Sequence, residues 1–322
     1  MYAILKRRRK MRDSTKEIFE KHEVRKTKEQ RKAFRDYIVA YAKSLGYEAR
    51  VESLGKAHNV IVGDPNKAEV LYTAHYDTCS VMPFPNFITP KCVPIYILYQ
   101  VILSLIIYIV PISVMIGSRH VLNATESNSL FILTLLGGYV LLILTSFLFI
   151  AGPANKYTAN DNTSGVTLLI DIMTDIPDEM KGKVAYIFFD LEERGLVGSK
   201  LYAKKHKTIA KSTPVINFDC VSDGNNILFV AKKGASDLAS KLEDAFISND
   251  KYSVEVVTKG AFYPSDQKNF TKGVGVAALN KFKCGILYMD KIHTPKDTVY
   301  DEENIEFLKC GAIKLVGLFA KG

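Results

Sequence analysis

Two adjacent glutamates, Glu192 and Glu193, follow an apolar run in the stretch YIFFDLEERGLVGS at residues 186–199. Neighbouring carboxylates repel each other, so in an ordinary protein both would turn into solvent. A bound cation, or a division of roles between an acid and a base, would instead keep both at the end of the strand. Taken alone, the pair favours the solvent-exposed arrangement. The other polar residues of the chain are needed to choose between this arrangement and a functional site.

Residues that can bind metals recur at the ends of other predicted strands. VLYTA leads to His75 and Asp77, VINF to Asp219 and GILYMD to His293, while Asp161 lies where a helix begins. Sites in open α/β sheets form beyond the carboxyl ends of the strands, so these side chains are expected to meet at one edge. Asp161 alone would be explained as a helix cap, and His293 alone as a surface histidine. As a set they favour a metal site.

The elements that would position these residues alternate between short strands and amphipathic helices. Before residue 90, a helix that stops at Gly46 precedes the strands HNVIVG and AEVLYTAHYD. After residue 151, the expected order is a helix from about Asn162 to Ile176, KVAYIFFD (strand), a short helix near SKLYAKKHK, PVINFD (strand), ASDLASKLEDAFISN (helix), YSVEVVT and CGILYMD (strands), and a helix from about Glu303 to Phe319. This order predicts an α/β fold with a mixed, mostly parallel sheet and helices on both faces.

Residues 91–151 interrupt this pattern with two apolar segments, at about 93–117 and 130–151, that contain no charged residue. Each meets the length of about 20 residues that a membrane-spanning helix needs. A core helix of this length would carry a polar face, so an inserted two-helix transmembrane hairpin is the better interpretation. Gly137 and Gly138 would allow close packing of helices, and the uncharged spans indicate no ion path.

Two spans return the chain to its starting side, so residues 35–90 and 152–322 would form one catalytic domain. Residues 1–34 form a basic N-terminal arm, and they begin without a signal peptide. These features predict an integral membrane protein, expected in the plasma membrane, whose catalytic domain faces the cytoplasm. The hairpin would contact the lipid bilayer through residues 93–151.

Charge and cysteine usage set further bounds. The net charge is +9, and residues 1–35 hold 14 Lys/Arg against 5 Asp/Glu, so the rest of the chain is neutral overall. Next to a membrane anchor, the run LKRRRKMR favours contact with anionic lipid or a solvated helix, and no nucleic-acid partner is expected. The five cysteines are scattered without C-x-x-C spacing, which argues against a disulfide framework and suits a reducing compartment.

Six motifs together resemble the M28 family of zinc aminopeptidases. They are, in chain order, AHYD, NDNTSG, FFDLEERGLVGS, NFDCVSDG, YPSDQ and IHTPKDT. The similarity extends from about residue 35 to the end of the chain and is interrupted by the hairpin. A related dinuclear carboxypeptidase-like group also has H-x-D and Glu-Glu and stays open as an alternative. The resemblance implies a peptide substrate and two divalent metal ions, with Zn²⁺ expected and Mn²⁺ or Co²⁺ left open by the ligand types.

The resemblance also implies a role for each candidate residue. The metal ligands would be His75 and Asp219 for one ion, Glu193 and His293 for the other, and Asp161 as a bridge. Glu192 would be the general base, which takes a proton from the metal-bound water and passes it to the departing amine. Asp77 would support the site from behind the ligands. Tyr263 would either stabilise the oxyanion or simply pack on the rim.

The chain departs from the family pattern in three places. Gln267 stands where many members have a histidine after Ser-Asp, and Ile292 precedes His293 where some have tyrosine; both would bear on substrate recognition. The hairpin, inserted between Asp77 and Asp161, would seat the active site close to the membrane. A glutaminyl-cyclase-like relative is disfavoured because the chain contains no Trp. A catalytically inactive scaffold is disfavoured because every ligand position and the general base are filled. For a function carried by the hairpin, the uncharged spans suggest no ion path.

Overall fold

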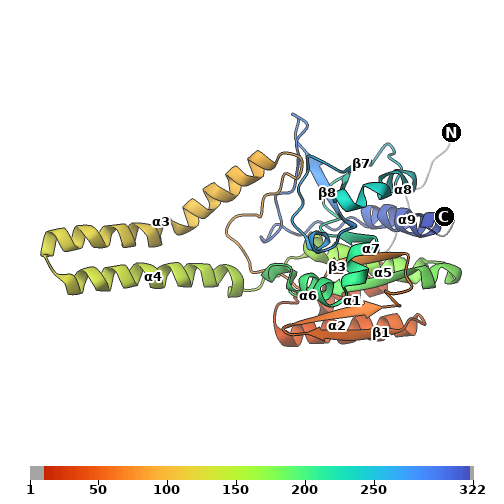
Figure 1. The fold of residues 1–322 in the computed structure, drawn as a ribbon, viewed down its shortest axis with the longest axis horizontal. Helices are drawn as coiled ribbons and strands as arrows, with labels where there is room; N and C mark the ends of the chain where they lie inside the picture. Colours follow the sequence, from red (N-terminus) through yellow and green to blue (C-terminus); the bar gives the residue numbers. More distant parts are fainter. Residues whose placement is uncertain (1–10, 320–322) are drawn as a thin grey trace.

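The computed structural model describes residues 11–319, so most of the basic run LKRRRKMR lies outside the described residues (Figure 1). The strands are β1 (Ala49–Leu54), β2 (Ala57–Val62), β3 (Val70–His75), β4 (Val184–Phe189), β5 (Val215–Phe218), β6 (Asn226–Ala231), β7 (Ser253–Val257), β8 (Gly273–Lys281) and β9 (Leu287–Tyr288). The helices are α1 (Asp13–Lys21), α2 (Lys28–Ser44), α3 (Val93–Thr125), α4 (Asn128–Ala151), α5 (Gly165–Asp175), α6 (Val197–Lys205), α7 (Lys207–Ser212), α8 (Ala239–Ala245) and α9 (Glu302–Phe319).

The strands form one mixed sheet in the order β1-β2-β4-β3-β5-β8-β6-β7, with β9 paired to β8. Its four central strands, β4, β3, β5 and β8, run parallel to one another. On either side of these strands the direction reverses, since β2 is antiparallel to β4 and β6 is antiparallel to β8; at the edges β1 is antiparallel to β2, whereas β7 is parallel to β6. The predicted fold class is thereby confirmed, and the carboxyl ends of the central strands share one edge.

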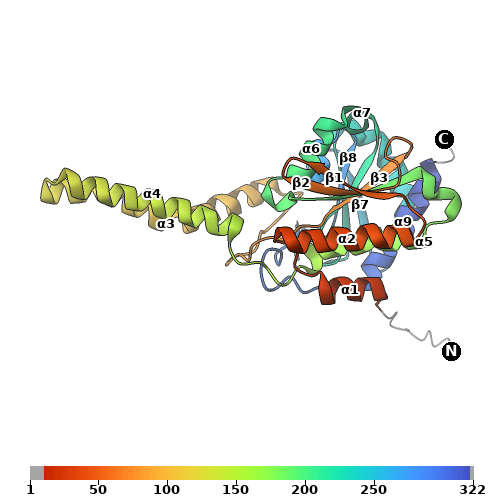
Figure 2. The same cartoon turned by 90° about the horizontal axis from the view of Figure 1, so that it is seen from below.

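Helices cover both faces of this sheet (Figure 2). On one face α1, α2, α5, α8 and α9 enclose the larger apolar core, which includes Phe34, Leu169 and Leu308. On the other face α6 and α7 cover a smaller core around Tyr202 and Phe270. The central strands are buried on both faces, which explains why VLYTA and VAYIFF are continuously apolar and do not alternate with polar residues.

Three strands of the sheet, β1, β6 and β8, were not predicted. Strand β8 is rich in Gly and Ala, which have low strand propensity. The fold needs these small residues because a Cβ at Gly273 would lie 2.1 Å from the main-chain oxygen of Gln267, and one at Gly275 would lie 2.6 Å from its Nε2. Conversely, the expected strand CGILYMD is reduced to Leu287–Tyr288, which runs antiparallel to β8.

The inserted hairpin extends away from the α/β domain as two packed helices (Figure 1). Both helices are longer than predicted, because the polar linker is helical and only Glu126 and Ser127 separate them. Gly138 lets the helices approach closely, since a Cβ there would lie 2.3 Å from Met115 Cγ. By length and composition each helix is a candidate membrane span, and in their most apolar windows only 17% and 6% of the residues are buried. A core helix of a soluble domain would be mostly buried.

The N-terminal segment is part of the catalytic fold from residue 12 onward. The boundary predicted between residues 34 and 35 falls inside α2, and Ile18 of α1 is completely buried in the larger core. Helix α2 begins with a capping box in which Thr27 and Gln30 satisfy each other's main-chain N–H groups. Only the part of the arm before residue 11 is left outside the described structure.

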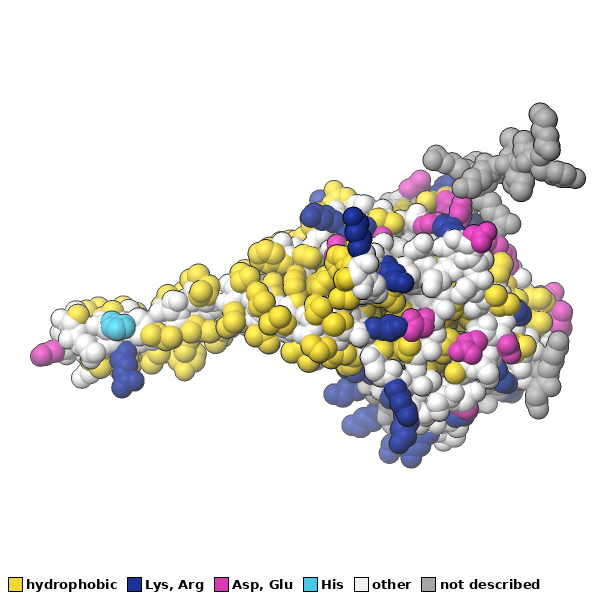
Figure 3. Space-filling model, turned by 90° about the horizontal axis from the view of Figure 1, so that it is seen from above, with side chains coloured by type: hydrophobic (Ala, Val, Ile, Leu, Met, Phe, Trp, Pro, Cys, Tyr) yellow, Lys and Arg dark blue, Asp and Glu magenta, His cyan; other side chains and the backbone are white. Residues whose placement is uncertain are grey.

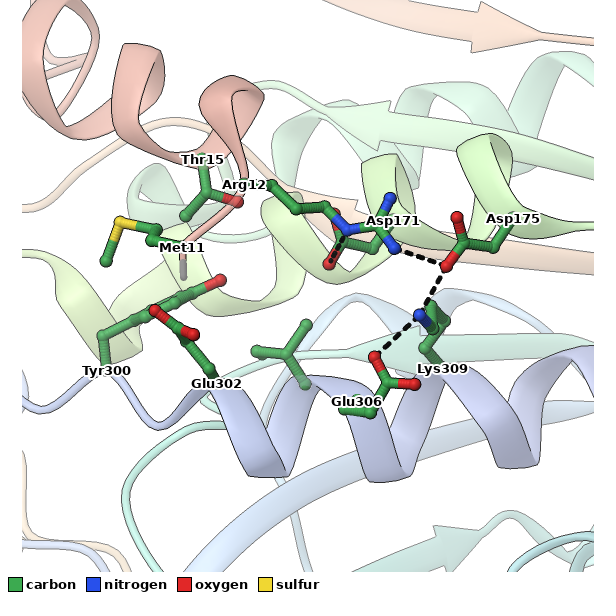
Figure 4. Close-up of a pocket in the computed structure, with 10 residues that line it drawn as sticks. Met11, Arg12, Thr15, Asp171, Asp175, Tyr300, Glu302, Glu306 and Lys309 are labelled. Atoms are coloured by element: carbon green, nitrogen blue, oxygen red, sulfur yellow. Dashed lines mark hydrogen bonds and ion pairs between the residues drawn. The ribbon is translucent and has the colours of Figure 1, made fainter. Parts of the chain in front are cut away.

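An ion-pair cluster ties the start of α1 to α5 and α9 around a cavity of about 230 Å³ (Figure 4). Arg12 Nε lies 3.3 Å from Asp171 Oδ2, and Arg12 also contacts Asp175, which is shared with Lys309 of α9. Asp171 is 7% exposed, and its Oδ1 has no hydrogen-bond partner in the described structure. Burial, only partly offset by the charges of Arg12 and Lys309, raises the pKa of Asp171 to about 6.

Replacing Asp171 with Asn is expected to stabilise the protein at neutral pH but not in acid. The folded state binds the Asp171 proton more tightly than the unfolded chain does, so its carboxylate destabilises the fold increasingly as the pH rises from about 4 to about 6. At about 1.4 kcal/mol per pKa unit, the variant should gain roughly 3 kcal/mol in free energy of unfolding at pH 7.5. Denaturation of both proteins at pH 4 and pH 7.5 checks this; an equal difference at the two pH values would contradict it.

Candidate metal centre

Three of the predicted strand-end positions meet at the carboxyl edge of the sheet. His75 ends β3, Asp219 follows β5, and Glu192 and Glu193 begin the short 3₁₀ turn after β4. We expected a strand of the parallel sheet to lead directly to His293. This was wrong, because His293 does not follow a central strand. It lies in the loop after β9 with a positive φ of 64°, and that loop folds back over the strand ends.

Asp161 joins these residues from the irregular segment that precedes α5 and presents one carboxylate oxygen to each histidine. Its Oδ1 lies 3.2 Å from His75 Nε2, and its Oδ2 lies 3.1 Å from His293 Nε2. A second carboxylate completes each group: Asp219 Oδ1 is 3.4 Å from His75 Nε2, and Glu193 Oε2 is 3.4 Å from His293 Nε2. The five predicted ligands therefore form two three-residue groups that share Asp161.

These spacings fit metal ions. Nitrogen and oxygen ligands at about 2.0–2.2 Å from a tetrahedral Zn²⁺ lie about 3.3–3.6 Å from one another, close to the distances found here. One group, formed by His75, Asp161 and Asp219, is buried. In the other group, Glu193 Oε1 is shielded from solvent and has no hydrogen-bond partner in the part of the chain that the structure describes. Two histidines with three carboxylates suit divalent ions such as Zn²⁺.

The pKa values of the histidines and carboxylates in this cluster indicate where positive charge is stabilised. Burial disfavours the protonated form of His293, but the charges of Glu193 and Asp161 outweigh it and raise the pKa of His293 to about 9. Burial also raises the pKa of Glu193 to about 8, although His293 acts in the opposite direction. Hydrogen bonds from both histidines overcome burial at Asp161 and lower its pKa. The carboxylates of this cluster therefore stabilise positive charge on the histidines, and a bound cation would supply the same charge.

Asp77 holds the two glutamates in place. Its Oδ1 and Oδ2 accept the main-chain N–H groups of Glu192 and Glu193 at 2.9 and 3.2 Å. The main-chain oxygen of Asp77 lies 3.1 Å from His75 Nδ1, which directs His75 Nε2 towards Asp161. Burial, together with the nearby charge of Glu193, raises the pKa of Glu192 well above its usual range, while His75 acts in the opposite direction. Glu192 makes no ion pair with either histidine, in contrast to Glu193.

Comparison with known families decides which class of protein has this arrangement. The profile of Peptidase family M28 matches residues 146–316, which is more than half of the chain. The chain belongs to peptidase family M28. The family and the fold together make it a metallopeptidase-like hydrolase. A search among curated proteins gave no match.

Solved structures with the same fold include peptidases and cyclases. The LapA aminopeptidase of Legionella pneumophila has a TM-score of 0.56 at 12% identity, covering 94% of this chain and 69% of that one. The glutaminyl cyclase of Porphyromonas gingivalis has a TM-score of 0.57 at 15% identity, covering 95% and 97%. A leucine aminopeptidase precursor from Bacteroides thetaiotaomicron has a TM-score of 0.54 at 14% identity, covering 94% and 93%. At these identities the likeness concerns the fold.

Three positioning residues of this M28 chain were missed at the sequence level. Asp297 accepts the main-chain N–H groups of Asn160 and Asp161 at 2.8 and 3.0 Å, which fixes the segment carrying the shared carboxylate. Asn160 Oδ1 accepts from the main chain at residues 222 and 223, and Asn162 Oδ1 accepts from Gly165. These residues lie inside the motifs NDNTSG and IHTPKDT, so the motifs could have indicated them as positioning residues.

Arg25, also missed, ties the N-terminal segment to the back of the metal centre. It is fully buried, and its guanidinium donates to the main-chain oxygens of Tyr76 and His22 and to Thr163 Oγ1. Tyr76 lies between His75 and Asp77, and Thr163 lies two residues beyond Asp161. Burial lowers the pKa of Arg25 to about 10, so it stays charged at neutral pH.

Replacing Arg25 with Lys is expected to lower the free energy of unfolding of the peptidase by about 2–4 kcal/mol, since one ammonium cannot reproduce the planar set of donors and leaves buried acceptors unsatisfied. Equilibrium denaturation of the wild type and the variant measures the change. Lys32→Arg, on the exposed side of α2, is the matched control and should leave stability within about 0.5 kcal/mol. A loss of the same size in both variants would contradict the role of Arg25.

The pocket in front of the metal centre has a volume of about 70 Å³ and is lined by residues from both halves of the catalytic domain. Tyr263 lies in its wall, where the hydroxyl donates to the main-chain oxygen of Asp219 at 2.9 Å. Ile292 also lines the pocket, whereas Gln267 lies behind it and donates from Nε2 to the main-chain oxygen of Tyr263 at 2.7 Å. Gln267 therefore supports the Tyr263 loop in this structure and does not line the pocket.

The segment that leads from the metal centre to the hairpin forms another wall of this pocket. Asn86 and Ile88 line it, and the foot of α3 fixes their position. Gln100 Nε2 donates to Asn86 Oδ1 at 3.1 Å, and the Tyr99 hydroxyl donates to the main-chain oxygen of Pro85 at 2.7 Å. The first turns of the hairpin thus contact the same segment that shapes the pocket.

Proposed function

We propose that this M28 peptidase is a dinuclear zinc aminopeptidase, anchored in a membrane by its hairpin with the catalytic domain in the cytoplasm. The observation that carries the proposal is the position of Asp161, whose two oxygens face His75 at 3.2 Å and His293 at 3.1 Å. A carboxylate shared in this way suits two cations held side by side. Glu192 belongs to neither of the two three-residue groups of candidate ligands that share Asp161.

The residues of the chain then divide the chemistry among them. Bound divalent ions would supply Lewis-acid activation of a water molecule and of the scissile carbonyl. Glu192 accepts the proton of the attacking water and delivers it to the departing amine nitrogen. Asp77 keeps Glu192 in reach by accepting its main-chain N–H. Tyr263 would stabilise the oxyanion after releasing its hydrogen bond to Asp219.

The surface of the hairpin supports membrane anchoring. In Figure 3 hydrophobic side chains cover the hairpin between its tip and the catalytic domain, with charged side chains at the tip and Lys or Arg around the junction. Along α3 and α4 the exposed residues include Leu105, Ile109, Leu133 and Ile143, each at least 53% exposed. Such a surface is stable in lipid, and cations near its foot suit phospholipid headgroups. The basic arm would add contacts with anionic lipid.

The position of the active site relative to the hairpin suggests substrates that lie near the bilayer. The pocket wall formed by Asn86 and Ile88 is only a few residues from Val93, where α3 begins. A peptide whose N-terminus emerges from the membrane surface would reach this pocket without leaving the headgroup region. We therefore include N-terminal segments of membrane proteins and membrane-associated peptides among the substrates.

A substrate panel tests the proposed activity. The full chain, purified in detergent and loaded with Zn²⁺, is offered aminoacyl substrates with a free N-terminus, their N-acetylated counterparts, and a peptide with N-terminal Gln. Release of the first residue from unblocked substrates alone supports an aminopeptidase. Loss of ammonia from the Gln peptide without cleavage would replace the proposal with cyclase activity, and cleavage from the carboxyl end would replace it with a carboxypeptidase.

A further inference from the structure

A cysteine thiol lies beside the metal group formed by Glu193 and His293. The Sγ of Cys79, a carboxylate oxygen of Glu193 and a ring nitrogen of His293 all lie within 4.8 Å of one another. Cys79 is 4% exposed, and it lines a cavity of about 120 Å³ together with Glu193 and His293. A thiol in this position is within reach of any cation that these two residues hold.

The Glu193 carboxylate near this thiol has an oxygen that a cation could bind. Glu193 Oε2 faces His293 at 3.4 Å, but Oε1 is shielded from solvent and has no hydrogen-bond partner among the described residues. A buried carboxylate oxygen without a partner is unfavourable, and a cation would satisfy it. His293, Glu193 and the shared Asp161 supply three ligands to this position, so a tetrahedral ion there has room for a fourth, and Cys79 Sγ lies within 4.8 Å of two of the three.

Main-chain contacts at the base of the hairpin hold Cys79 next to Glu193 and His293. The two chain segments that flank the hairpin pair with each other through a β-bridge between Ser80 and Ala154, and the main-chain N–H of Asn155 donates to the oxygen of Cys79 at 3.2 Å. On the other side, the N–H of Met82 donates to the main-chain oxygen of His293 at 2.7 Å. Cys79 is therefore fixed relative to His293 by main-chain bonds at Cys79 itself and three residues later, at Met82.

We propose that the Cys79 thiolate is the fourth protein ligand of the cation held by Glu193, His293 and Asp161. This inference rests on the dinuclear centre of the proposed function. On binding, a sulfur–metal bond forms and the thiol proton passes to solvent. The ligand set then favours thiophilic ions, Zn²⁺, Co²⁺ or Cd²⁺, over Mn²⁺ and Mg²⁺. With four protein ligands, this position also binds its ion more tightly than the position at His75 and Asp219, which has three.

Cobalt substitution tests the proposal without relying on catalysis. The full chain in detergent is depleted of metal and titrated with Co²⁺, and the near-ultraviolet band of sulfur-to-cobalt charge transfer is recorded. In the wild type, we expect the band to develop as the first, more tightly bound equivalent of Co²⁺ is added. In Cys79→Ser the band should be missing, and the variant should bind this equivalent of Co²⁺ at least about tenfold more weakly than the wild type. Cys220→Ser probes the buried thiol next to Asp219, and Cys284→Ser replaces an exposed one; both should retain the band.

Each other outcome has a defined meaning. A band that persists in Cys79→Ser, or that is lost in Cys220→Ser, overturns the proposal, and so does a wild type that binds two Co²⁺ without a band. If Cys79→Ser does not fold, alkylation of the wild type decides: Zn²⁺ should protect Cys79 from iodoacetamide and leave Cys284 reactive, and equal labelling of Cys79 with and without Zn²⁺ overturns it. A Cys79-dependent band in a protein that cleaves no peptide would leave this proposal standing and remove the proposed function.

Discussion

Replacing Glu192 with Gln is expected to abolish most peptide hydrolysis while leaving two metal ions bound. Removal of a general base typically lowers kcat by about 10²–10⁴-fold. Metal binding should survive because Glu192 pairs with neither histidine, while Asp77 still accepts the main-chain N–H at this position. Steady-state kinetics on an unblocked aminoacyl substrate, with metal content measured on the same samples, tests both halves of the expectation.

The neighbouring glutamate provides the matched control. Glu193→Gln makes the same change one residue further along, but it alters a carboxylate that lies 3.4 Å from His293. This variant should lose about one metal ion per chain together with its activity. Loss of metal from both variants would make Glu192 a ligand, and full activity in Glu192→Gln would exclude it as the base.

Replacing Asp161 with Asn is expected to remove most of the stabilisation that metal binding gives the fold. A ligand that binds only the folded state stabilises it by about 2.7 kcal/mol at 100 times its Kd. For a domain of this size, that corresponds to roughly 5–10 °C in Tm for each site filled. Because both histidines face the carboxylate of Asp161, its loss weakens both sites at once. The measurement is Tm with and without Zn²⁺ for each protein.

Asp171→Asn is the control for this experiment, since it makes the same change ten residues further along the chain, in the cluster between α1, α5 and α9. It should show the full Zn²⁺-dependent shift. A shift in Asp161→Asn as large as that of the wild type would show that Asp161 does not bind the ions. A shift missing from all proteins, including the wild type, would show that the cluster holds no Zn²⁺.

The clustering of the candidate ligands was largely predictable because the parallel strands have a simple geometry. His75, Asp219 and the glutamate pair directly follow buried apolar runs, and the carboxyl ends of parallel strands meet at one edge. The path of the chain to His293 was not predictable in this way, since a loop with a left-handed residue brings it in. Here the motif IHTPKDT indicated the residue, although the strand in front of it is shorter than expected and runs antiparallel to β8.

The remaining misses share a physical reason, which is that tertiary contacts override local preference. Strand β8 contains Gly273 and Gly275 because Gln267 packs against them, and no local pattern shows such a contact. Arg25 looked like one more charge of a basic arm, but it is buried, and two of its acceptors, the main-chain oxygen of Tyr76 and Thr163 Oγ1, lie 51 and 138 residues away. Asp297 and Asn160 act only through the segments that they hold in place.

The bridge between Ser80 and Ala154 makes the two-helix hairpin a modular insertion in the α/β fold. Because the two stems of the insertion are joined to each other at its base, the sheet does not depend on the two helices to hold its loops together. Insertions with adjacent ends are the kind that a domain tolerates well. A domain with this fold can therefore gain or exchange such a hairpin without rearranging its sheet, and the connector at residues 81–92 sets how the candidate site lies relative to the hairpin.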